Sequence, residues 1–467
     1  MVFIMEFITL PAKNVPARAY DVVVAGGGTG GVFAAIAAAR CGARTALIES
    51  KGYVGGIATE GGCGLHSFYN NWKAFGVEKR MVVRGIPEEF IQRLYNAGGC
   101  SGHNDTVMRP EYDNDTLCVD VERYKFVALE MLREAGVDTL LNTFASDVLV
   151  DDGRITGVVA ESHEGTEAVL GRFFVDATGY GDISGKAGAA FNEPNDYPVV
   201  NSMGVGGVDI DRYYAFLRDT GALYEYARGP RSGRSGQIIR ADGDWKKISM
   251  EAFAAAQALG MSAVTTTIHD NYFMFIKINF KMAVSPSNRD ALAEAEYELR
   301  RRQLGALELI RKTIPGAANA FIARSAPTIT IRRARCIECD YDITNEEVIN
   351  CAHFDDDIYS YGFHDSAPRI QIKGGGTYGL PYRAILVKRI ENLYAIGMMI
   401  TSDHEAHMST RNTVSCMAMG QAAGTAAALC AKEGCSGTRE LPYGKLRDAL
   451  HMANVWFDGG VAYKELQ

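Results

Sequence analysis

The chain has 467 residues, of which 47% are hydrophobic and 22% charged, and a formal net charge of −8. Its length favours two or more domains, and its acidic balance gives no electrostatic reason to expect nucleic acid or anionic lipid as a partner. No run reaches the roughly 18 apolar residues of a membrane span, and the scattered cysteines have no disulfide-framework density, so we expect a reduced, cytoplasmic protein without membrane attachment. The apolar segment Met1–Leu10 lacks a basic region and a cleavage site, and therefore predicts a β-strand rather than a signal peptide.

A glycine-rich turn connects a strand to a helix near the N-terminus. The apolar run Asp21–Ala25 predicts a buried parallel strand, and a G-x-G-x-x-G pattern follows at Gly26, Gly28 and Gly31. The alanine-rich helix Val32–Arg40 would direct its free N–H groups at a pyrophosphate. This order of strand, turn and helix predicts a dinucleotide-binding unit.

The next segment indicates which dinucleotide is bound. A second strand, Thr45–Ile48, ends at Glu49, an acid placed to accept hydrogen bonds from the adenosine ribose. A nicotinamide-binding fold would normally continue into another strand and helix. This chain instead has the glycine pairs Gly55–Gly56 and Gly61–Gly62 in a loop that could run beside an extended cofactor. The pattern favours a flavin dinucleotide.

A second glycine pattern occurs late in the chain. Gly374, Gly376 and Gly379 repeat the spacing of the first turn, but Pro381 follows at once and no alanine-rich helix comes after it. We expect this segment to be a loop. No convincing second dinucleotide unit is left, which argues against a reductase with its own NAD(P)H domain.

Two further segments have the pattern of strands that end at a cofactor. The first, Arg172–Asp182, is a buried run that ends in an Ala-Thr-Gly turn. The second, Leu393–Ile396, ends at Gly397, and after a polar loop a helix of small residues runs from Thr413 to about Cys430. The N-terminus of that helix could face the flavin N1 and C2 carbonyl, where its partial positive charge would stabilise negative charge on the flavin.

At these residues the chain resembles the FAD-dependent oxidoreductases of the glutathione-reductase-like superfamily, in the branch related to fumarate reductase flavoproteins. The resemblance rests on Ala19–Gly62, Phe173–Asp182, Pro327–Thr344 and Pro381–Leu429. It implies an α/β fold with a Rossmann-like FAD-binding domain, whose parallel sheet carries a β-hairpin or meander insertion, and an inserted α+β substrate or cap domain. The expected boundaries are 1–194 and 324–467, the latter with C-terminal helices, for the FAD-binding domain, and 195–323 for the cap.

The same resemblance implies the residues that hold FAD. They fall into groups along the pyrophosphate, the adenosine ribose, the ribityl chain, the adenine and the flavin pyrimidine. In chain order they are Gly26, Gly28, Thr29, Gly30, Gly31, Glu49, Ser50, Gly55, Gly56, Ala58, Thr59, Ala145, Ala177, Thr178, Gly179, Gly397, Met398, Met399, Asn412, Thr413 and Val414.

The middle of the chain loses the glycine-turn pattern and is rich in aromatic residues. The runs Val264–Thr267 and Tyr272–Asn279 predict a pair of strands. Ser287 and Asp290 have the spacing of a capping box at the start of a long helix, which ends before Pro315. We interpret this part as the substrate or cap domain; alternatively, it only buries the flank of the FAD-binding domain.

The segment Ala326–Thr344 has the pattern of one long strand. Strand alternation would place the thiols of Cys336 and Cys339 on opposite faces, so we expect neither a redox pair nor a metal site there. The same alternation places Arg333 and Arg335 on one face and Arg332 on the other. One of these faces could look into the active site, and surface ion pairs are an equal alternative.

A polar loop before the flavin-facing helix supplies the candidate catalytic residues. A histidine can exchange a proton near neutral pH, and an arginine can bind a carboxylate through two parallel hydrogen bonds. Helix capping and cofactor contacts are the alternative roles, and no metal is expected. The candidates are His404, His407 and Arg411, together with His66 from the loop after the second glycine pair.

The sequence therefore predicts an FAD-dependent oxidoreductase that transfers a hydride between a small polar organic substrate and flavin N5. The alternatives are an NAD-dependent dehydrogenase, a flavin-binding scaffold, and an electron-transfer subunit without a small substrate of its own. The expected partner is a small molecule, and a homo-oligomer is possible.

Overall fold

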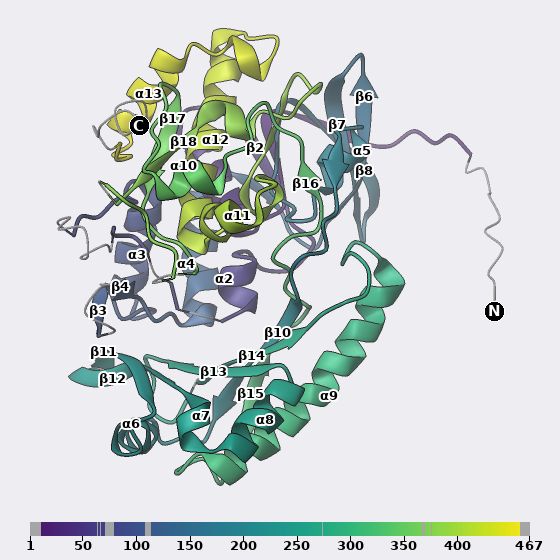
Figure 1. Ribbon diagram of the computed structural model, residues 1–467. Helices are drawn as coiled ribbons and strands as arrows, with labels where there is room; N and C mark the ends of the chain where they lie inside the picture. Colours follow the sequence, from purple (N-terminus) through teal and green to yellow (C-terminus); the bar gives the residue numbers. More distant parts are fainter. Residues whose placement is uncertain are drawn as a thin grey trace.

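The computed structural model describes residues 11–457 apart from 63, 66, 71–78, 108–113, 273, 367, 368 and 375. Within these residues the chain forms two lobes, each with its own sheet and hydrophobic core (Figure 1). The strand predicted at Met1–Leu10 lies outside the described residues.

The first sheet combines a parallel part with an antiparallel extension, as predicted. β1 (Ala17–Ala25) pairs in parallel with β2 (Thr45–Ile48) and β8 (Gly165–Asp176). The outer parallel strands are β5 (Asp138–Leu140) and β19 (Leu393–Ala395). The antiparallel strands β6 (Phe144–Asp151) and β7 (Arg154–Ser162) complete the order β5-β2-β1-β8-β7-β6. The predicted α/β class is confirmed.

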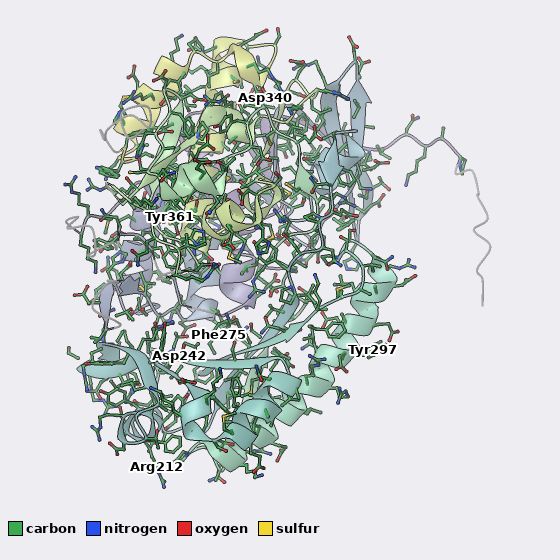
Figure 2. The ribbon with its side chains drawn as sticks, viewed as in Figure 1. Arg212, Asp242, Phe275, Tyr297, Asp340 and Tyr361 are labelled. Atoms are coloured by element: carbon green, nitrogen blue, oxygen red, sulfur yellow. The ribbon has the colours of Figure 1, made fainter. Side chains whose placement is uncertain are left out.

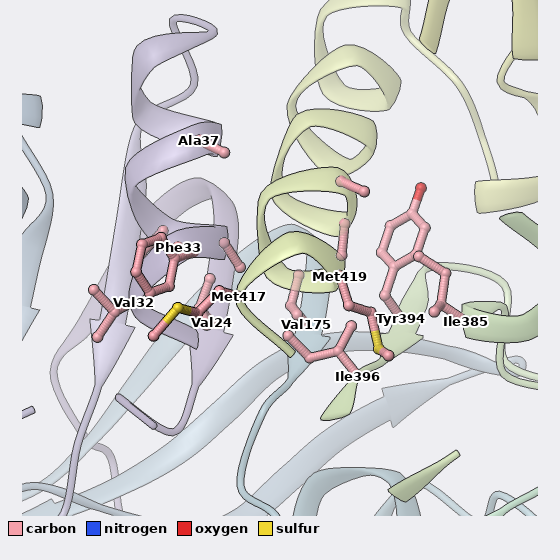
Figure 3. Close-up of a cluster of buried hydrophobic side chains, with 14 of the residues drawn as sticks. Val24, Val32, Phe33, Ala37, Val175, Ile385, Tyr394, Ile396, Met417 and Met419 are labelled. Atoms are coloured by element: carbon pink, nitrogen blue, oxygen red, sulfur yellow. The ribbon is translucent and has the colours of Figure 1, made fainter. Parts of the chain in front are cut away.

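Two helices built from small residues pack together over this sheet. They are α1 (Thr29–Arg40) and α12 (Thr413–Glu433), which lie side by side above β1 and β8 (Figure 3). A Cβ atom added at Gly420 would lie 2.1 Å from the Gly30 carbonyl oxygen, and one at Gly424 would lie 2.0 Å from the Ala34 oxygen. Only glycine permits this approach of the two backbones.

Within the described residues, α12 is also the one helix long and apolar enough to cross a membrane. However, 94% of its apolar window is buried inside the protein, as expected for a core helix. The helices α3 (Ile86–Asn96) and α13 (Tyr443–Met452) pack against it, and α4 (Val121–Ala135) packs against α1 and α3.

The second sheet has eight strands in the order β15-β10-β14-β13-β12-β11-β3-β4. The predicted pairing in the middle of the chain is confirmed, since β13 and β14 are antiparallel neighbours. The two strands β3 and β4 come from the part of the chain that precedes the expected cap. The strands are β3 (Asn104–Val107), β4 (Asn114–Thr116), β10 (Val199–Gly206), β11 (Leu223–Arg231), β12 (Arg234–Gly243), β13 (Met261–Thr266), β14 (Met274–Phe280) and β15 (Phe321–Ser325).

Helices cover the face of the second sheet that points away from the first lobe. The long helix α9 (Arg289–Thr313) buries Ala295, Leu299 and Ile310 in this core. Its N-cap is Asn288, whose side chain accepts a hydrogen bond from Ala291 N at 2.9 Å, so the predicted capping box is wrong. The shorter helices are α6 (Ile210–Asp219), α7 (Trp245–Ile248) and α8 (Met250–Ala258).

Short elements connect the lobes and surround α12. The long strand predicted at Ala326–Thr344 is wrong: only β16 (Cys336–Ile337) is a strand, and the rest is irregular apart from isolated bridges. The predicted loop around Gly374 is confirmed, because β18, which pairs with β17, follows it instead of a helix. The remaining elements are α2 (Ile57–Glu60), α5 (Asp182–Lys186), β9 (Phe191–Asn192), α10 (Asn345–Ile349), β17 (Asp357–Tyr361), β18 (Tyr378–Pro381), α11 (His404–Thr410), and the 3-10 turns Tyr382–Ile385, Gly397–Met399 and Thr438–Glu440.

We expect Gly420→Ala to destabilise the protein by about 1–3 kcal/mol, because the new methyl group would collide with the Gly30 carbonyl and separate α1 from α12. Gly444→Ala in α13 is the matched control, since no heavy atom beyond its own neighbours lies within 4 Å of the added Cβ. Denaturant unfolding measures both variants. Equal stability of the two would contradict the close packing described for Gly420.

A histidine between the two lobes predicts a pH-dependent contribution to stability. His103 lies before β3 and contacts Glu88 of α3 through Nε2 at 2.9 Å and Asp115 of β4 through Nδ1 at 3.4 Å. Burial alone would lower the pKa of His103, but the hydrogen bonds to Asp115 and Glu88 outweigh it and raise the pKa to about 9. The ordinary value in an unfolded chain is about 6.5.

The stabilisation is therefore complete below about pH 6.5 and is lost as the pH rises through about 9. We expect the excess stability of the wild type over His103→Gln to shrink across this window in pH-dependent denaturant unfolding. The exposed His163, replaced in the same way, serves as the control. A difference between wild type and His103→Gln that is independent of pH would refute the ion pairs.

Candidate active site

A cavity of about 670 Å³ lies between the two lobes, with walls from both sheets. One part is lined by the glycine turn, Glu49 and the loop after β8, and the other by β10, β12, β13, β14 and α9 of the second lobe. The N-terminus of α12, at Thr413, lines the same cavity. Residues from distant parts of the chain thus meet around one space.

The glycine turn forms a cradle that fits a pyrophosphate. Gly26 has φ +96°, and an added Cβ would lie 2.5 Å from Ala177 O. A Cβ at Gly31 would lie 1.8 Å from Gly26 O, so both positions require glycine for protein packing. A Cβ at Gly28 would meet only Ala177 O, at 3.7 Å, and would project into the cavity. Since no side chain caps α1, its first N–H groups are available to phosphate oxygens.

Glu49 is fixed where the adenosine ribose is expected. Its Oε2 accepts a hydrogen bond from Gly27 N at 2.8 Å, and its Oε1 accepts from Lys51 N at 2.9 Å and from Ser50 Oγ at 3.1 Å. The side chain lines the cavity, and an ionised carboxylate has about four acceptor positions. The acceptor positions that remain on the Glu49 carboxylate can accept hydrogen bonds from ribose hydroxyl groups. Ala145, expected beside the adenine, lines the cavity nearby with Phe144.

A buried carboxylate shapes the loop after β8. Asp176 is fully buried, and its Oδ1 accepts hydrogen bonds from Thr178 N at 3.1 Å and Thr178 Oγ1 at 2.7 Å. Its Oδ2 accepts from Ser184 N at 2.8 Å and Ser184 Oγ at 2.6 Å. Four hydrogen bonds satisfy the charge and hold the loop rigidly against the cavity, which Ala177, Thr178 and Gly179 line.

The flavin end of the cavity is formed by the start of α12 and the turn after β19. Thr413 lines the cavity, and Asn412 caps the helix by accepting a hydrogen bond from Val414 N at 3.2 Å. Gly397 and Met398 also line the cavity. This arrangement fits the prediction that the helix N-terminus faces the flavin.

Not every predicted cofactor residue faces the cavity. The lining includes Gly26, Gly28, Thr29, Gly30, Glu49, Ser50, Gly56, Ala145, Ala177, Thr178, Gly179, Gly397, Met398 and Thr413. The others lie behind it and support the lining backbone; for example, Gly55 N donates to Gly27 O at 2.8 Å. This second group is Gly31, Gly55, Ala58, Thr59, Met399, Asn412 and Val414.

Of the candidate catalytic residues, the structure places Arg411 on the cavity wall. Its guanidinium forms an ion pair with Asp365 and lies over the Tyr197 ring, with Cζ 5.4 Å from the ring centroid. Its Nε is buried and has no hydrogen-bond partner in the described part of the chain. Arg411 is therefore only partly satisfied by the protein.

The two histidines do not line the cavity. His404 stacks on Tyr197, with ring centroids 4.4 Å apart, and its Nδ1 lies 2.7 Å from Asp196 Oδ2. His407 is fully buried, with Nδ1 3.2 Å from the Tyr197 hydroxyl and Nε2 3.0 Å from Met398 O. Burial and the nearby Arg333 and Arg411 charges lower the pKa of His407 well below its ordinary value, so the imidazole is neutral. His66 lies outside the described residues.

The sequence analysis interpreted the middle of the chain as a substrate or cap domain but assigned none of its residues to the site. Phe275 and Lys277 on β14 line the cavity, whereas the alternate residues Ile276 and Ile278 enter the core. Arg240 on β12 lines the cavity as well. Figure 2 places Phe275 and Asp242 on the side of the sheet nearer to the first lobe and Arg212 on the opposite side. The alternation of apolar and other residues in β14 distinguishes two faces of the strand, but it does not indicate which face lines the cavity.

The arginine-rich segment has a different arrangement from the predicted strand. Arg332 lines the cavity, whereas Arg333 is buried and forms an ion pair with Asp196, and Arg335 contacts Asp182 at 3.1 Å. Cys336 and Cys339 are both buried, free thiols. Among the described residues, no group of three or more His, Cys, Asp or Glu side chains has metal-binding geometry.

Comparisons with known proteins agree with this geometry. The family described as FAD dependent oxidoreductase matches residues 21–450. The chain is 29% identical over 154 residues to the dihydrolipoyl dehydrogenase of Zymomonas mobilis and 29% identical over 234 residues to digeranylgeranylglycerophospholipid reductase 2 of Methanothermobacter thermautotrophicus. These matches cover 32% and 47% of this chain but only 28% and 57% of the relatives' own lengths.

A solved structure with a similar chain path is the geranylgeranyl bacteriochlorophyll reductase-like protein of Thermoplasma acidophilum. It has 14% sequence identity and a TM-score of 0.49, and the match covers 96% of this chain and 90% of that chain.

Gly28→Val tests the placement of the cofactor. Because the added side chain projects into the cavity and not into protein atoms, the variant should fold normally but bind FAD at least about tenfold more weakly. The flavin-to-protein ratio and the FAD dissociation constant measure this effect, and Gly444→Val on the outer helix α13 is the control. Normal FAD binding by a folded Gly28→Val protein would show that the pyrophosphate lies elsewhere.

Proposed function

Because the chain belongs to the family of FAD-dependent oxidoreductases, we propose that it transfers a hydride between flavin N5 and a small polar organic substrate. One observation carries this proposal: polar side chains of the second lobe and Arg411 line the same cavity as the glycine turn and the N-terminus of α12. Bound FAD supplies the hydride acceptor or donor, and the protein supplies binding, orientation and electrostatics. The narrower resemblance to the branch of fumarate reductase flavoproteins is part of this proposal and is supported by the motif Ser402–Arg411.

The charges on the cavity wall favour a small polar substrate over a long apolar one. Arg240, Lys277, Glu296 and Arg332 line the part formed with the second lobe. One relative is a digeranylgeranylglycerophospholipid reductase, but a long lipid chain would desolvate the guanidinium groups of Arg332 and Arg411, which keep unused N–H donors among the described residues, without offering them a hydrogen bond. A polar substrate would instead exchange hydrogen bonds with them.

We assign Arg411 the role of substrate anchor and the two histidines the role of positioning residues. Both histidine rings contact Tyr197, over which the Arg411 guanidinium lies. His404 packs against the face of this ring, and His407 contacts its hydroxyl group and also the Met398 carbonyl oxygen on the cavity wall. The second sheet forms one wall of this cavity.

An anaerobic screen of the purified FAD-loaded protein tests the proposed function. Hydroxy acids, sugars and amines are mixed with the oxidised protein, and the corresponding oxidised compounds with the reduced protein. We expect at least one small polar compound to change the visible flavin absorption within the enzyme's turnover time, because substrate and flavin share one cavity. If only long-chain lipids or a protein partner exchange electrons with the flavin, the proposal is wrong.

A further inference from the structure

One half-buried cation on the cavity wall, Arg332, has no counter-ion among the described residues. Arg332 lines the cavity, and its one hydrogen bond within the described residues is a long contact of 3.4 Å from Nη1 to Pro198 O. No carboxylate in the described part of the chain lies within ion-pair distance of its guanidinium. A guanidinium has five N–H donors, so most of its hydrogen-bonding capacity is directed to something other than protein.

The neighbouring arginines are satisfied in a different way. Arg333 pairs with Asp196 and donates to Thr401 O at 2.8 Å, and Arg335 pairs with Asp182 and donates to Tyr180 O at 3.0 Å. Each of these two arginines thus has a carboxylate beside its guanidinium. Arg332, which faces the cavity, is the exception among these three.

Arg332 and Arg411 lie beside the same short segment of chain. Arg332 contacts the carbonyl oxygen of Pro198, and Arg411 lies over the ring of the preceding residue, Tyr197. Burial first, and then the Arg411 charge, lowers the pKa of Arg332, while Asp365 opposes this effect. Asp365 is also the ion-pair partner of Arg411. Two cations and one carboxylate leave about one positive charge at this wall.

We infer that Arg332 and Arg411 together bind a carboxylate group of the substrate. This inference rests on the proposed function, since it names the class of the small polar substrate. A carboxylate carries one negative charge and matches the excess at this wall, whereas a phosphate monoester carries about −1.5 to −2. The planar guanidinium also suits two parallel hydrogen bonds to a carboxylate. The pyrophosphate of FAD has its own cradle at the start of α1.

The test uses pairs of ligands that differ only in charge. Lactate and lactamide, glycolate and glycolamide, and succinate and succinamide are titrated into the FAD-loaded protein, with binding followed by the perturbation of the visible flavin spectrum. Ethyl phosphate, a phosphate monoester without a carboxylate, tests the phosphate alternative. We expect at least one carboxylate to bind roughly 10- to 100-fold more tightly than its amide, and this preference to be lost in Arg332→Gln and reduced in Arg411→Gln.

Two controls make the result specific. Arg369→Gln removes the same charge from a side chain that is 66% exposed and paired with Glu405, and it should leave the preference unchanged. Arg332→Lys keeps the positive charge but loses the planar guanidinium that can donate two parallel hydrogen bonds. It should therefore recover part of the preference that Arg332→Gln loses. The inference is overturned if no carboxylate is preferred over its amide, if the preference persists in Arg332→Gln, or if ethyl phosphate binds more tightly than every carboxylate. It is also overturned if Arg332→Gln alters only the flavin potential.

Failure of this inference and failure of the proposed function are distinguishable. Binding requires no turnover, so a carboxylate preference without any flavin reduction supports the anion site and contradicts hydride transfer. Conversely, reduction by a neutral alcohol at equal rates in wild type and Arg332→Gln supports hydride transfer and contradicts the carboxylate site.

Discussion

The close contact between α1 and α12 is the constraint on which the rest of the site depends. At Gly420 and Gly424 the second helix lies directly against backbone carbonyls of the first, at distances that exclude any side chain. The contact holds the two helix N-termini at the same cavity, one at the glycine turn and the other at Thr413. The N-terminus of α1 can thus place partial positive charge at the pyrophosphate of a dinucleotide, and the N-terminus of α12 can do the same at its flavin ring.

The second lobe completes the site through polar contacts with the first. Arg324 on β15 donates to the carbonyl oxygens of Glu60 and Gly61, at 2.7 and 3.1 Å, beside the expected ribityl path. On the far edge of the same sheet, Asp115 accepts from Ser67 N at 3.1 Å and contacts His103. These contacts anchor both edges of the sheet and leave its middle strands facing the cavity.

The two lobes contribute different sets of polar groups to the cavity wall. The first lobe contributes the glycine turn and helix N-termini, which suit a cofactor by shape and partial charge, together with the charged side chains of Glu49 and Arg411. The second lobe and the segment before β16 contribute full charges, among them Lys277 and Arg332. A buried charge is costly unless it is paired, so the Arg332 guanidinium, which has no carboxylate within ion-pair distance in the described part of the chain, indicates the polarity of what enters the cavity.

Local patterns in the sequence were sufficient for the elements that bind the nucleotide. The turn at Gly26, the strand Thr45–Ile48 and the helix that begins at Thr413 were predicted with little error, because each is determined by residues close together in the chain. The predicted strand at Ala326–Thr344 failed because its residues bond to several different segments, including Val200 and Val387. The positions of Arg332, Lys277 and His407 relative to the cavity were decided only by the tertiary structure, since they depend on how two lobes with separate cores face each other, and no local spacing records that orientation.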